Sequence, residues 1–340
     1  MLHGESMRTL LTYFILAQAI LAQHTLYVCG SISKGFVVGK RLEPSGLYIR
    51  DGAGGAGGFR HVGFTHPYLA TVALAPGGGN TLYAAAGNGV IRMSPAGEHW
   101  KILTDWRHTE FQDIAVEAGA PATIYAASTD GIIATNDGGA TWREASAGLR
   151  RRFIQTLAVD RTRAGRVLAG GEDGLYVSGD GARSWTPVDS SARMVTDIEQ
   201  SPHDPAVWVA ATQGHGILLS RDGGVSWKRL ASVPAEGFTW NNADFSPHSP
   251  LTLAAVAFSQ GVWVSEDLGE TWQDRGAGLP TRQVWRARFD PDARGRLWAS
   301  VHEEALYVSD DSGVSGWRRA GLEGSVALDL VFLPVKGVRP

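Results

Sequence analysis

An eight-residue box of the form Ser/Thr-x-Asp-x-Gly-x-Thr/Ser-Trp recurs along this chain, each time directly after a short apolar stretch. Three copies are intact, a fourth has Ala182 in place of the glycine, and a fifth has one extra residue before the tryptophan. Aspartate and glycine suit a tight turn, because aspartate accepts hydrogen bonds from nearby backbone N–H groups and glycine tolerates positive φ. We therefore expect each box to be a structural turn whose tryptophan packs between neighbouring units. The residues that define the five boxes are Asp137, Gly139, Trp142, Asp180, Trp185, Asp222, Gly224, Trp227, Asp267, Gly269, Trp272, Asp311, Gly313 and Trp317.

The boxes belong to a longer repeat of 42 to 45 residues. Each repeat contains four short stretches rich in β-branched, aromatic or alternating apolar residues, which predict four strands. In one repeat these strands are expected at residues 154–160, 166–170, 174–178 and 185–188. A period of about 40–45 residues with four strands is typical of a propeller blade. The sequence thus predicts an all-β, seven-bladed β-propeller with four-stranded blades, whose third strands open at Gly46, Gly89, Gly131, Gly174, Gly216, Gly261 and Ala305.

The two ends of the chain do not follow the order of the other repeats. The first strands expected, at residues 25–29, 46–50 and 59–62, match the second, third and fourth strands of a blade. The last, at residues 326–333, matches a first strand. We expect the C-terminal strand to pair with the three N-terminal strands, because this closure leaves no open sheet edge. The single propeller is expected to span residues 23–334, with a short tail at 335–340.

The N-terminus resembles an export signal. Arg8 precedes an apolar run at residues 10–22, which is short for a membrane span, and small residues at Ala17, Ala19 and Ala22 offer cleavage points. Translation starts at Met1 or Met7. We expect residues 1–22 to be a signal peptide and the mature protein to be periplasmic or extracellular; a buried first strand or helix is the alternative. No other segment is apolar enough to cross a bilayer, so no membrane span is expected after cleavage.

Composition excludes several kinds of site. The single cysteine, Cys29, permits no internal disulfide and no cysteine-based metal centre. A net charge of −3 gives no general attraction to polyanions, so we expect no nucleic acid partner. No nucleophile elbow, phosphate-binding loop or zinc motif occurs, and we expect no cofactor and no metal. We expect a monomer.

Candidate functional residues gather on the first strands, which line the central channel of a propeller. Alternate residues of these strands are apolar, and the others are small or polar. In three consecutive repeats the polar positions are charged or amide-bearing, and further candidates stand at the strand starts and in loops on the same face. These residues are Asp197, Glu199, Asn242, Asp244, Arg286, Arg288, Trp240, Trp285, His215 and His302, with Glu303 and Glu304 beside the last.

Two interpretations of this polar set remain open. It is either a paired network that satisfies buried charges, or a ligand site. In the ligand site, Arg286 and Arg288 bind a carboxylate or phosphate, aromatic rings stack on the ligand, and Asp197, Glu199 and Asp244 act as acid and base.

The boxes resemble the Asp-box, or BNR, repeats of bacterial neuraminidases, xyloglucan-cleaving glycosidases, the sortilin ectodomain and photosystem II assembly-factor-like propellers. The resemblance covers the chain from about residue 25 to 333 and is closest, in size and export signal, to the assembly-factor-like proteins. It implies a propeller in the wider WD40/YVTN/BNR-like group, and it carries over no activity, because enzymes and non-enzymes share the box. The Arg-Ile-Pro motif of sialidases is missing, and the xyloglucan enzymes resemble two such rings where this chain has one.

Two functions follow as hypotheses. The first is an exported, non-catalytic scaffold that binds a protein partner or a small or carbohydrate ligand at the channel mouth. The second is a carbohydrate-active enzyme, either a glycosidase of sialidase-like or other type or a polysaccharide lyase. Carboxyl groups about 5–9.5 Å apart across an open pocket favour hydrolysis, whereas carboxylates held against Arg286 or Arg288 favour the scaffold.

Overall fold

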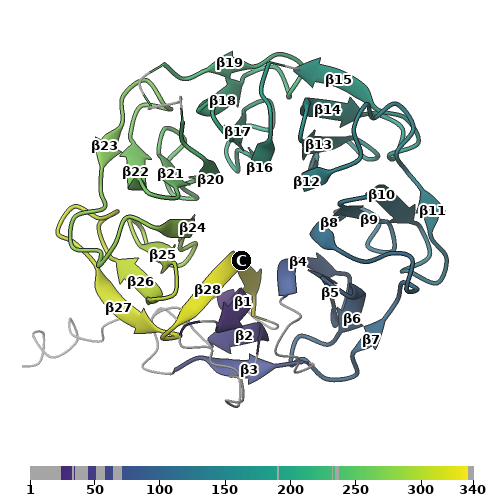
Figure 1. Cartoon of the computed structure of the whole chain (residues 1–340), viewed down its shortest axis with the longest axis horizontal. Helices are drawn as coiled ribbons and strands as arrows, with labels where there is room; N and C mark the ends of the chain where they lie inside the picture. The colour runs from purple at the N-terminus through teal and green to yellow at the C-terminus, as the bar shows by residue number, and fades with distance from the viewer. Residues whose placement is uncertain are drawn as a thin grey trace, which may run out of the picture.

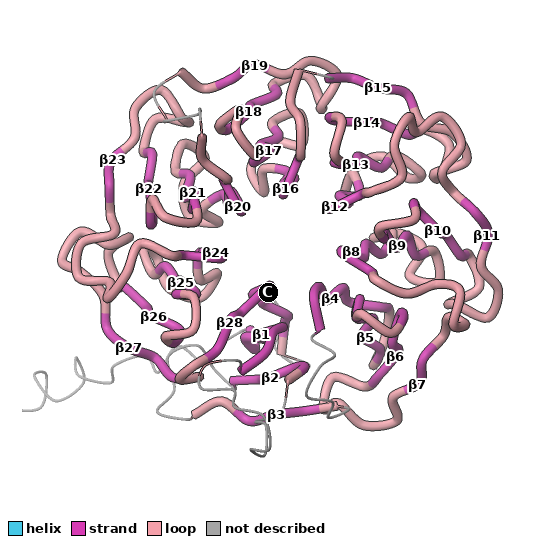
Figure 2. The backbone as a smooth tube through the Cα atoms, in the orientation of Figure 1, coloured by secondary structure: helices cyan, strands magenta, loops and turns pink. Residues whose placement is uncertain are grey.

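The protein is a ring of seven four-stranded antiparallel sheets around a central channel, shown by the computed structural model in Figure 1. The structure describes residues 24–32, 34, 45–50, 58–63, 71–189, 191–231, 233 and 237–335. The expected signal peptide and residues 336–340 of the expected tail lie outside this part of the chain. The described part consists of strands joined by loops and turns (Figure 2), and it contains no helix long and apolar enough to span a membrane. The predicted all-β, seven-bladed architecture is confirmed.

Each blade contributes one strand to the channel wall and three strands outside it. The inner strands are β4 (Thr71–Gly77), β8 (Phe111–Val116), β12 (Ile154–Val159), β16 (Val195–Gln200), β20 (Trp240–Phe245), β24 (Val284–Phe289) and β28 (Ser325–Pro334). The second strands are β5 (Thr81–Ala86), β9 (Ile124–Ser128), β13 (Val167–Gly171), β17 (Trp208–Thr212), β21 (Leu253–Ala257), β25 (Leu297–Val301) and β1 (His24–Ile32). The third strands are β6 (Gly89–Met93), β10 (Gly131–Thr135), β14 (Gly174–Ser178), β18 (Ile217–Ser220), β22 (Gly261–Ser265), β26 (Ala305–Ser309) and β2 (Gly46–Arg50). The outer strands are β7 (Lys101–Ile102), β11 (Arg143–Glu144), β15 (Thr186–Asp189), β19 (Lys228–Arg229), β23 (Gln273–Asp274), β27 (Arg318–Gly321) and β3 (Arg60–Val62).

The ring closes through strands from opposite ends of the chain. β28 pairs with β1, so that Val331 lies opposite Tyr27, and β1 continues the sheet to β2 and β3. In Figure 1 the yellow β28 lies beside the purple β1. This pairing converts two ends into one complete blade, because β28 covers the edge of β1 that would otherwise be unpaired. The predicted closure is confirmed.

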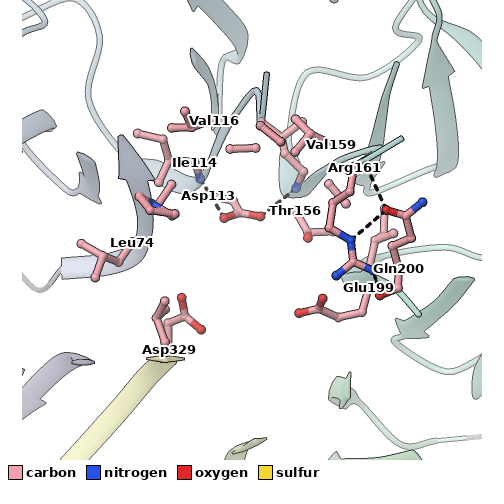
Figure 3. Close-up of a pocket in the computed structure, with 18 of the residues that line it drawn as sticks. Leu74, Asp113, Ile114, Val116, Thr156, Val159, Arg161, Glu199, Gln200 and Asp329 are labelled. Atoms are coloured by element: carbon pink, nitrogen blue, oxygen red, sulfur yellow. Dashed lines mark hydrogen bonds between the residues drawn. The ribbon is translucent and has the colours of Figure 1, made fainter. Parts of the chain in front are cut away.

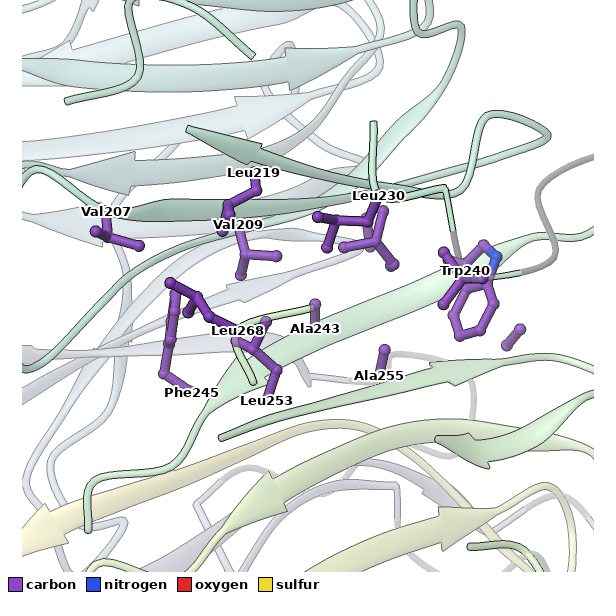
Figure 4. Close-up of a cluster of buried hydrophobic side chains, with 14 residues drawn as sticks. Val207, Val209, Leu219, Leu230, Trp240, Ala243, Phe245, Leu253, Ala255 and Leu268 are labelled. Carbon is purple, nitrogen blue, oxygen red and sulfur yellow. The ribbon is translucent and has the colours of Figure 1, made fainter. Parts of the chain in front are cut away.

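The hydrophobic core is divided into seven clusters, each between two neighbouring sheets. Figure 4 shows the cluster between the sheets that contain β16 and β20, where Val209, Leu219, Phe245 and Leu253 interdigitate. Because every sheet presents apolar side chains to both neighbours, blade packing holds each inner strand in a fixed position at the channel wall.

The box turns lie at the outer rim of the five blades that contain them. In one copy, the Asp222 carboxylate accepts hydrogen bonds from the hydroxyl of Ser220 at 2.8 Å and from the backbone N–H of Ser226 at 2.9 Å. Gly224 has φ of +78°, and a Cβ there would lie 2.6 Å from Leu168 of the preceding blade. Glycine therefore suits this position in both backbone conformation and blade contact, whereas the copy with Ala182 holds a non-glycine residue there at φ of +58°.

The box tryptophans pack against the seams between blades. Trp185 and Trp317 donate their indole N–H groups to carbonyls of the preceding blade, Ala145 at 2.6 Å and Arg275 at 2.7 Å. The indole of Trp227 instead donates within its own box, to the Gly224 carbonyl at 3.2 Å. These contacts fit the structural role expected from the sequence.

Candidate functional site

A β-bulge near the start of the inner strands determines which side chains reach the channel. In β20, for example, Trp240 pairs with Ala257 and Asn242 with Val256, so Asn241 is an extra residue without a partner on β21. The same shift occurs in β4, β8, β12, β16 and β24, and where β28 pairs with β1. A bulge re-aims the side chains around it. Six of the bulged residues line one cavity at this end of the channel: Gln112, Gln155, Thr196, Asn241, Trp285 and Leu328.

Two cavities follow one another along the channel. The strand-start cavity has a volume of about 310 Å³ and lies where the inner strands begin. The strand-end cavity, of about 540 Å³, is lined by polar groups from five inner strands, some of which Figure 3 shows. Asp113, Thr156 and Arg286 line both cavities and mark the boundary between them.

Arg288 is the centre of one charged cluster in the channel. Its Nη1 group donates to Glu199 and, at 2.8 Å, to Asp244. Its Nε donates to the Leu330 carbonyl at 3.3 Å, and its Nη2 lies 4.0 Å from Asp329. The Asp244 side chain is only 10% exposed, so its charge depends on the guanidinium for compensation.

Arg286 organises a second cluster next to the first. Its Nη1 lies 3.1 Å from Asp197, and its Nε lies 3.6 Å from Asp329 and donates to the Leu328 carbonyl at 3.0 Å. The two arginines thus divide four carboxylates between them, and Asp329 lies within reach of both. Of the two interpretations left open by the sequence, the paired network describes this arrangement.

The same polar residues also join neighbouring blades to one another. Each uses a side-chain oxygen to accept a backbone N–H from the inner strand of the next blade, so these residues act as fasteners along the channel wall. The pairs are Asp113 with Leu157 at 2.7 Å, Asp197 with Ala243 at 3.2 Å, Asn242 with Ala287 at 3.0 Å, and Asp244 with Phe289 at 2.8 Å. Asn242 also returns a hydrogen bond to the Ala287 carbonyl at 2.9 Å.

Burial shifts the protonation of these carboxyl groups. It raises the pKa of Asp197 and of Asp244 to about 6, against the opposing attraction of Arg286 and Arg288 respectively. Burial also raises the pKa of Asp113 to about 7, although its oxygens accept backbone N–H groups. Raised values of this kind accompany both catalytic sites and structural ion networks, so they do not identify a function alone.

Two candidate ligand residues from the sequence belong to the core instead. Trp240 is 0% exposed and packs against Trp263 with ring centroids 6.5 Å apart. It occupies the first position of its inner strand, before the bulge, and this position faces the sheet interior. Asn242 is also 0% exposed, and its amide is occupied by the neighbouring blade. The structure accounts for these two side chains by packing and by bonds between blades.

The remaining candidates lie on the strand-start face. Trp285 is a bulged residue, lines the strand-start cavity and is partly exposed. His302 packs edge-on against it with ring centroids 6.1 Å apart and also contacts Phe258, so it lies beside the cavity wall. His215 is partly buried in the turn between β17 and β18 and is not among the residues that line this cavity.

Two carboxylates of the network were not singled out from the sequence. Asp113 and Asp329 come from blades outside the three charged repeats, yet both line the strand-end cavity and Asp329 contacts both arginines. They occupy the same strand position as Asp197, which is the signal that identifies them. In the part of the chain that the structure describes, no group of three or more His, Cys, Asp or Glu side chains is arranged to hold a metal ion.

Comparison with known proteins shows similarity in fold. No protein-family model and no curated protein sequence matches the chain. Among solved structures, an ancestral GH74 enzyme is 18% identical with a TM-score of 0.61, and the match covers 78% of this chain and 38% of that one. The GH74 xyloglucanase from Xanthomonas campestris is 17% identical with a TM-score of 0.65, covering 83% and 50%.

A smaller protein is similar over most of its length. YCF48, in a structure with a bound D1 peptide, is 16% identical with a TM-score of 0.56, and the match covers 73% of this chain and 81% of that one. The chain spans half or less of the two GH74 enzymes. At these identities the similarity establishes the β-propeller fold, which enzymes and non-enzymes share.

Proposed function

We propose that this protein is a non-catalytic binding or assembly scaffold that receives its ligand or partner at the strand-start mouth of the channel. The proposal rests on one observation: carboxylates in the channel are already bonded to arginines and to backbone N–H groups of the protein. Both oxygens of Asp244 are occupied, one by Arg288 and one by the backbone N–H of Phe289. Asp197 is held in the same way by Arg286 and the N–H of Ala243.

A hydrolytic site needs a carboxyl group that is free to give a proton to the substrate and a second one to act as nucleophile or base. Glu199 and Asp244 share one nitrogen of Arg288, so each carboxylate is held by a counter-charge, although Glu199 also lines the strand-end cavity. This arrangement supports a binding role over the alternative, a carbohydrate-active enzyme. The similar fold of YCF48 with its bound peptide supports the idea that a propeller of this size can serve as a scaffold.

The proposal predicts no turnover. Purified protein incubated with a panel of β-linked and α-linked glycans, including xyloglucan and sialylated and uronic-acid-containing substrates, is expected to release no products above a buffer control. Reducing-end assays and mass spectrometry measure this directly. Turnover that is lost in both Asp197→Ala and Asp244→Ala, with both variants folded by circular dichroism, contradicts the proposed role.

We also propose that residues 1–22 direct export. The support is the sequence pattern of Arg8 followed by the apolar run and small residues. Expression in a bacterial host is expected to yield a periplasmic protein whose N-terminus, measured by mass spectrometry, begins after Ala19 or Ala22. Retention of Met1 or Met7 in the folded product, or recovery only from the cytoplasm, rules out cleavage at these positions.

A further inference from the structure

The strand-start cavity has the chemistry of a neutral hydrogen-bonding site. Its wall is formed by the bulged residues of six consecutive blades, with Thr239 and Gln213 from neighbouring loops. Amide and hydroxyl groups supply most of its polar surface, and Trp285, Met194 and Leu328 supply apolar surface. Each amide presents a donor and an acceptor side by side.

Several of these groups have unused hydrogen-bonding capacity. Asn241 commits one N–H to the Val284 carbonyl at 3.1 Å, and Gln155 directs its amide nitrogen to Gln112 at 3.5 Å. The amide oxygens of Asn241 and Gln155 have no partner among the described residues. The indole N–H of Trp285 is buried in the described structure without a hydrogen-bond acceptor. Buried donors without partners are rare, and an acceptor on a bound ligand would satisfy this one.

The charged groups at the inner end of this cavity are already satisfied. Both oxygens of Asp113 accept backbone N–H groups, from Ile114 and Leu157, each at 2.7 Å. Arg286 is paired with Asp197 and bonded to a carbonyl. An anionic ligand would therefore find no free cation here, because Arg286 is already paired, and its desolvation would be uncompensated.

We propose that the strand-start cavity binds a neutral saccharide, with the amides of Gln155 and Asn241 bonding adjacent hydroxyl groups and Trp285 contacting the apolar C–H face of the sugar ring. The inference rests on the proposed binding role and names its ligand class. Vicinal hydroxyls both donate and accept, which matches paired amide groups, and an indole offers an apolar body with one polar N–H.

The size of the cavity limits the ligand. Its volume of about 310 Å³ is at the lower end of the range of about 300–1,000 Å³ for small-molecule pockets. This favours one or two sugar rings over a long polymer. An extended peptide passing through the channel would have to displace the Arg286–Asp197 pair at the boundary with the strand-end cavity.

The test is calorimetric titration of the full chain with single compounds. Glucose, galactose, mannose, xylose, cellobiose and maltose are the neutral probes, and glucuronate, glucosamine and an unrelated hydrophilic peptide are the comparison ligands. At least one neutral sugar is expected to bind, with its charged analogue at least about tenfold weaker, a difference of about 1.4 kcal/mol.

Variants then locate the site. Gln155→Ala removes a free acceptor and only one long hydrogen bond to the protein, so it is expected to keep its thermal midpoint and to weaken binding about tenfold. Trp285→Phe keeps a ring and removes the indole N–H, and is expected to weaken binding less. Asn136→Ala, at an exposed amide of a box turn on the outer rim, is the matched control and is expected to bind as the original chain does.

Each other outcome overturns the inference. These outcomes are no neutral sugar bound at millimolar concentration, unchanged binding in Gln155→Ala, or preference for the peptide or a charged analogue. The proposed function is tested separately: absence of both binding and turnover removes only the saccharide inference, whereas a sugar that is bound here and hydrolysed removes only the non-catalytic role.

Discussion

Replacing Arg288 with alanine is expected to lower the free energy of unfolding by about 3–5 kcal/mol at pH 8. The arginine is the shared partner of Glu199 and Asp244, and its side chain is 20% exposed. Its removal leaves two carboxylates in the channel without a compensating charge, which costs more than the loss of an exposed pair. Denaturant unfolding of the variant and the original chain measures the difference.

The loss is expected to shrink as the pH falls. Burial holds the folded-state pKa of Asp244 at about 6, above its ordinary 3.8, so this carboxyl stabilises the fold fully at low pH and its contribution is lost as the pH rises through 6. Without Arg288, which lowers this pKa, ionisation costs still more. The destabilisation measured at pH 8 is therefore expected to exceed that at pH 5.

Two further variants test whether the loss of stability comes from the buried ion network or from the removal of any arginine. Arg282 makes a bidentate pair with Asp274 at 2.7 Å, but the two side chains are 46% and 39% exposed, so Arg282→Ala is expected to cost at most about 1 kcal/mol. Combining Arg288→Met with Glu199→Gln and Asp244→Asn is expected to restore part of the stability. Equal losses for Arg288→Ala and Arg282→Ala at both pH values would falsify the network's role in holding the blades.

The repeat in the sequence was sufficient to predict the ring and its closure. Seven strand patterns at a nearly constant period, with incomplete units at the two ends, allow one arrangement in which the end strands together complete the seventh blade. The polar face of the inner strands was also readable, because alternation by two separates core from channel residues. Arg286, Arg288 and their carboxylates are therefore brought together as the pattern indicated.

The contacts of individual side chains were harder to predict from the sequence. A β-bulge adds one residue to the inner strand and leaves no mark in apolar alternation, so Trp240 and Trp285 looked equivalent as aromatic residues at strand starts. The sequence also did not indicate that the Asn242 amide forms hydrogen bonds with the neighbouring blade, because that contact joins residues 45 positions apart. Whether a polar group is free depends on such contacts between blades.

The bulged residues of the inner strands and the residues that follow them make different contacts in the channel. Residues after the bulge, such as Asp197 and Arg286, pair with each other and with the next blade. The bulged residues themselves, such as Gln155 and Asn241, keep hydrogen-bonding groups that the protein does not use. In β8, β16 and β20, the residue after the bulge bonds the next blade, and the bulged residue before it lines the strand-start cavity.

Substitution of Trp240 by alanine tests this division and is expected to destabilise the protein by about 3–5 kcal/mol, as is usual for truncation of a buried tryptophan. The indole is 0% exposed and packs in the cluster between the sheets of β16 and β20, against Trp263. Trp240→Phe is expected to recover part of the loss, because it leaves a smaller cavity. Thermal and denaturant unfolding provide the measurement.

Trp285→Ala is the matched comparison, since this indole lies one strand position further along and is partly exposed at the strand-start cavity. It is expected to lose less stability than Trp240→Ala and more ligand affinity, because the wall of the cavity changes while the core between blades stays filled. The opposite pattern, with Trp240→Ala stable but unable to bind and Trp285→Ala unfolded, would mean that the bulge directs the other tryptophan into the channel.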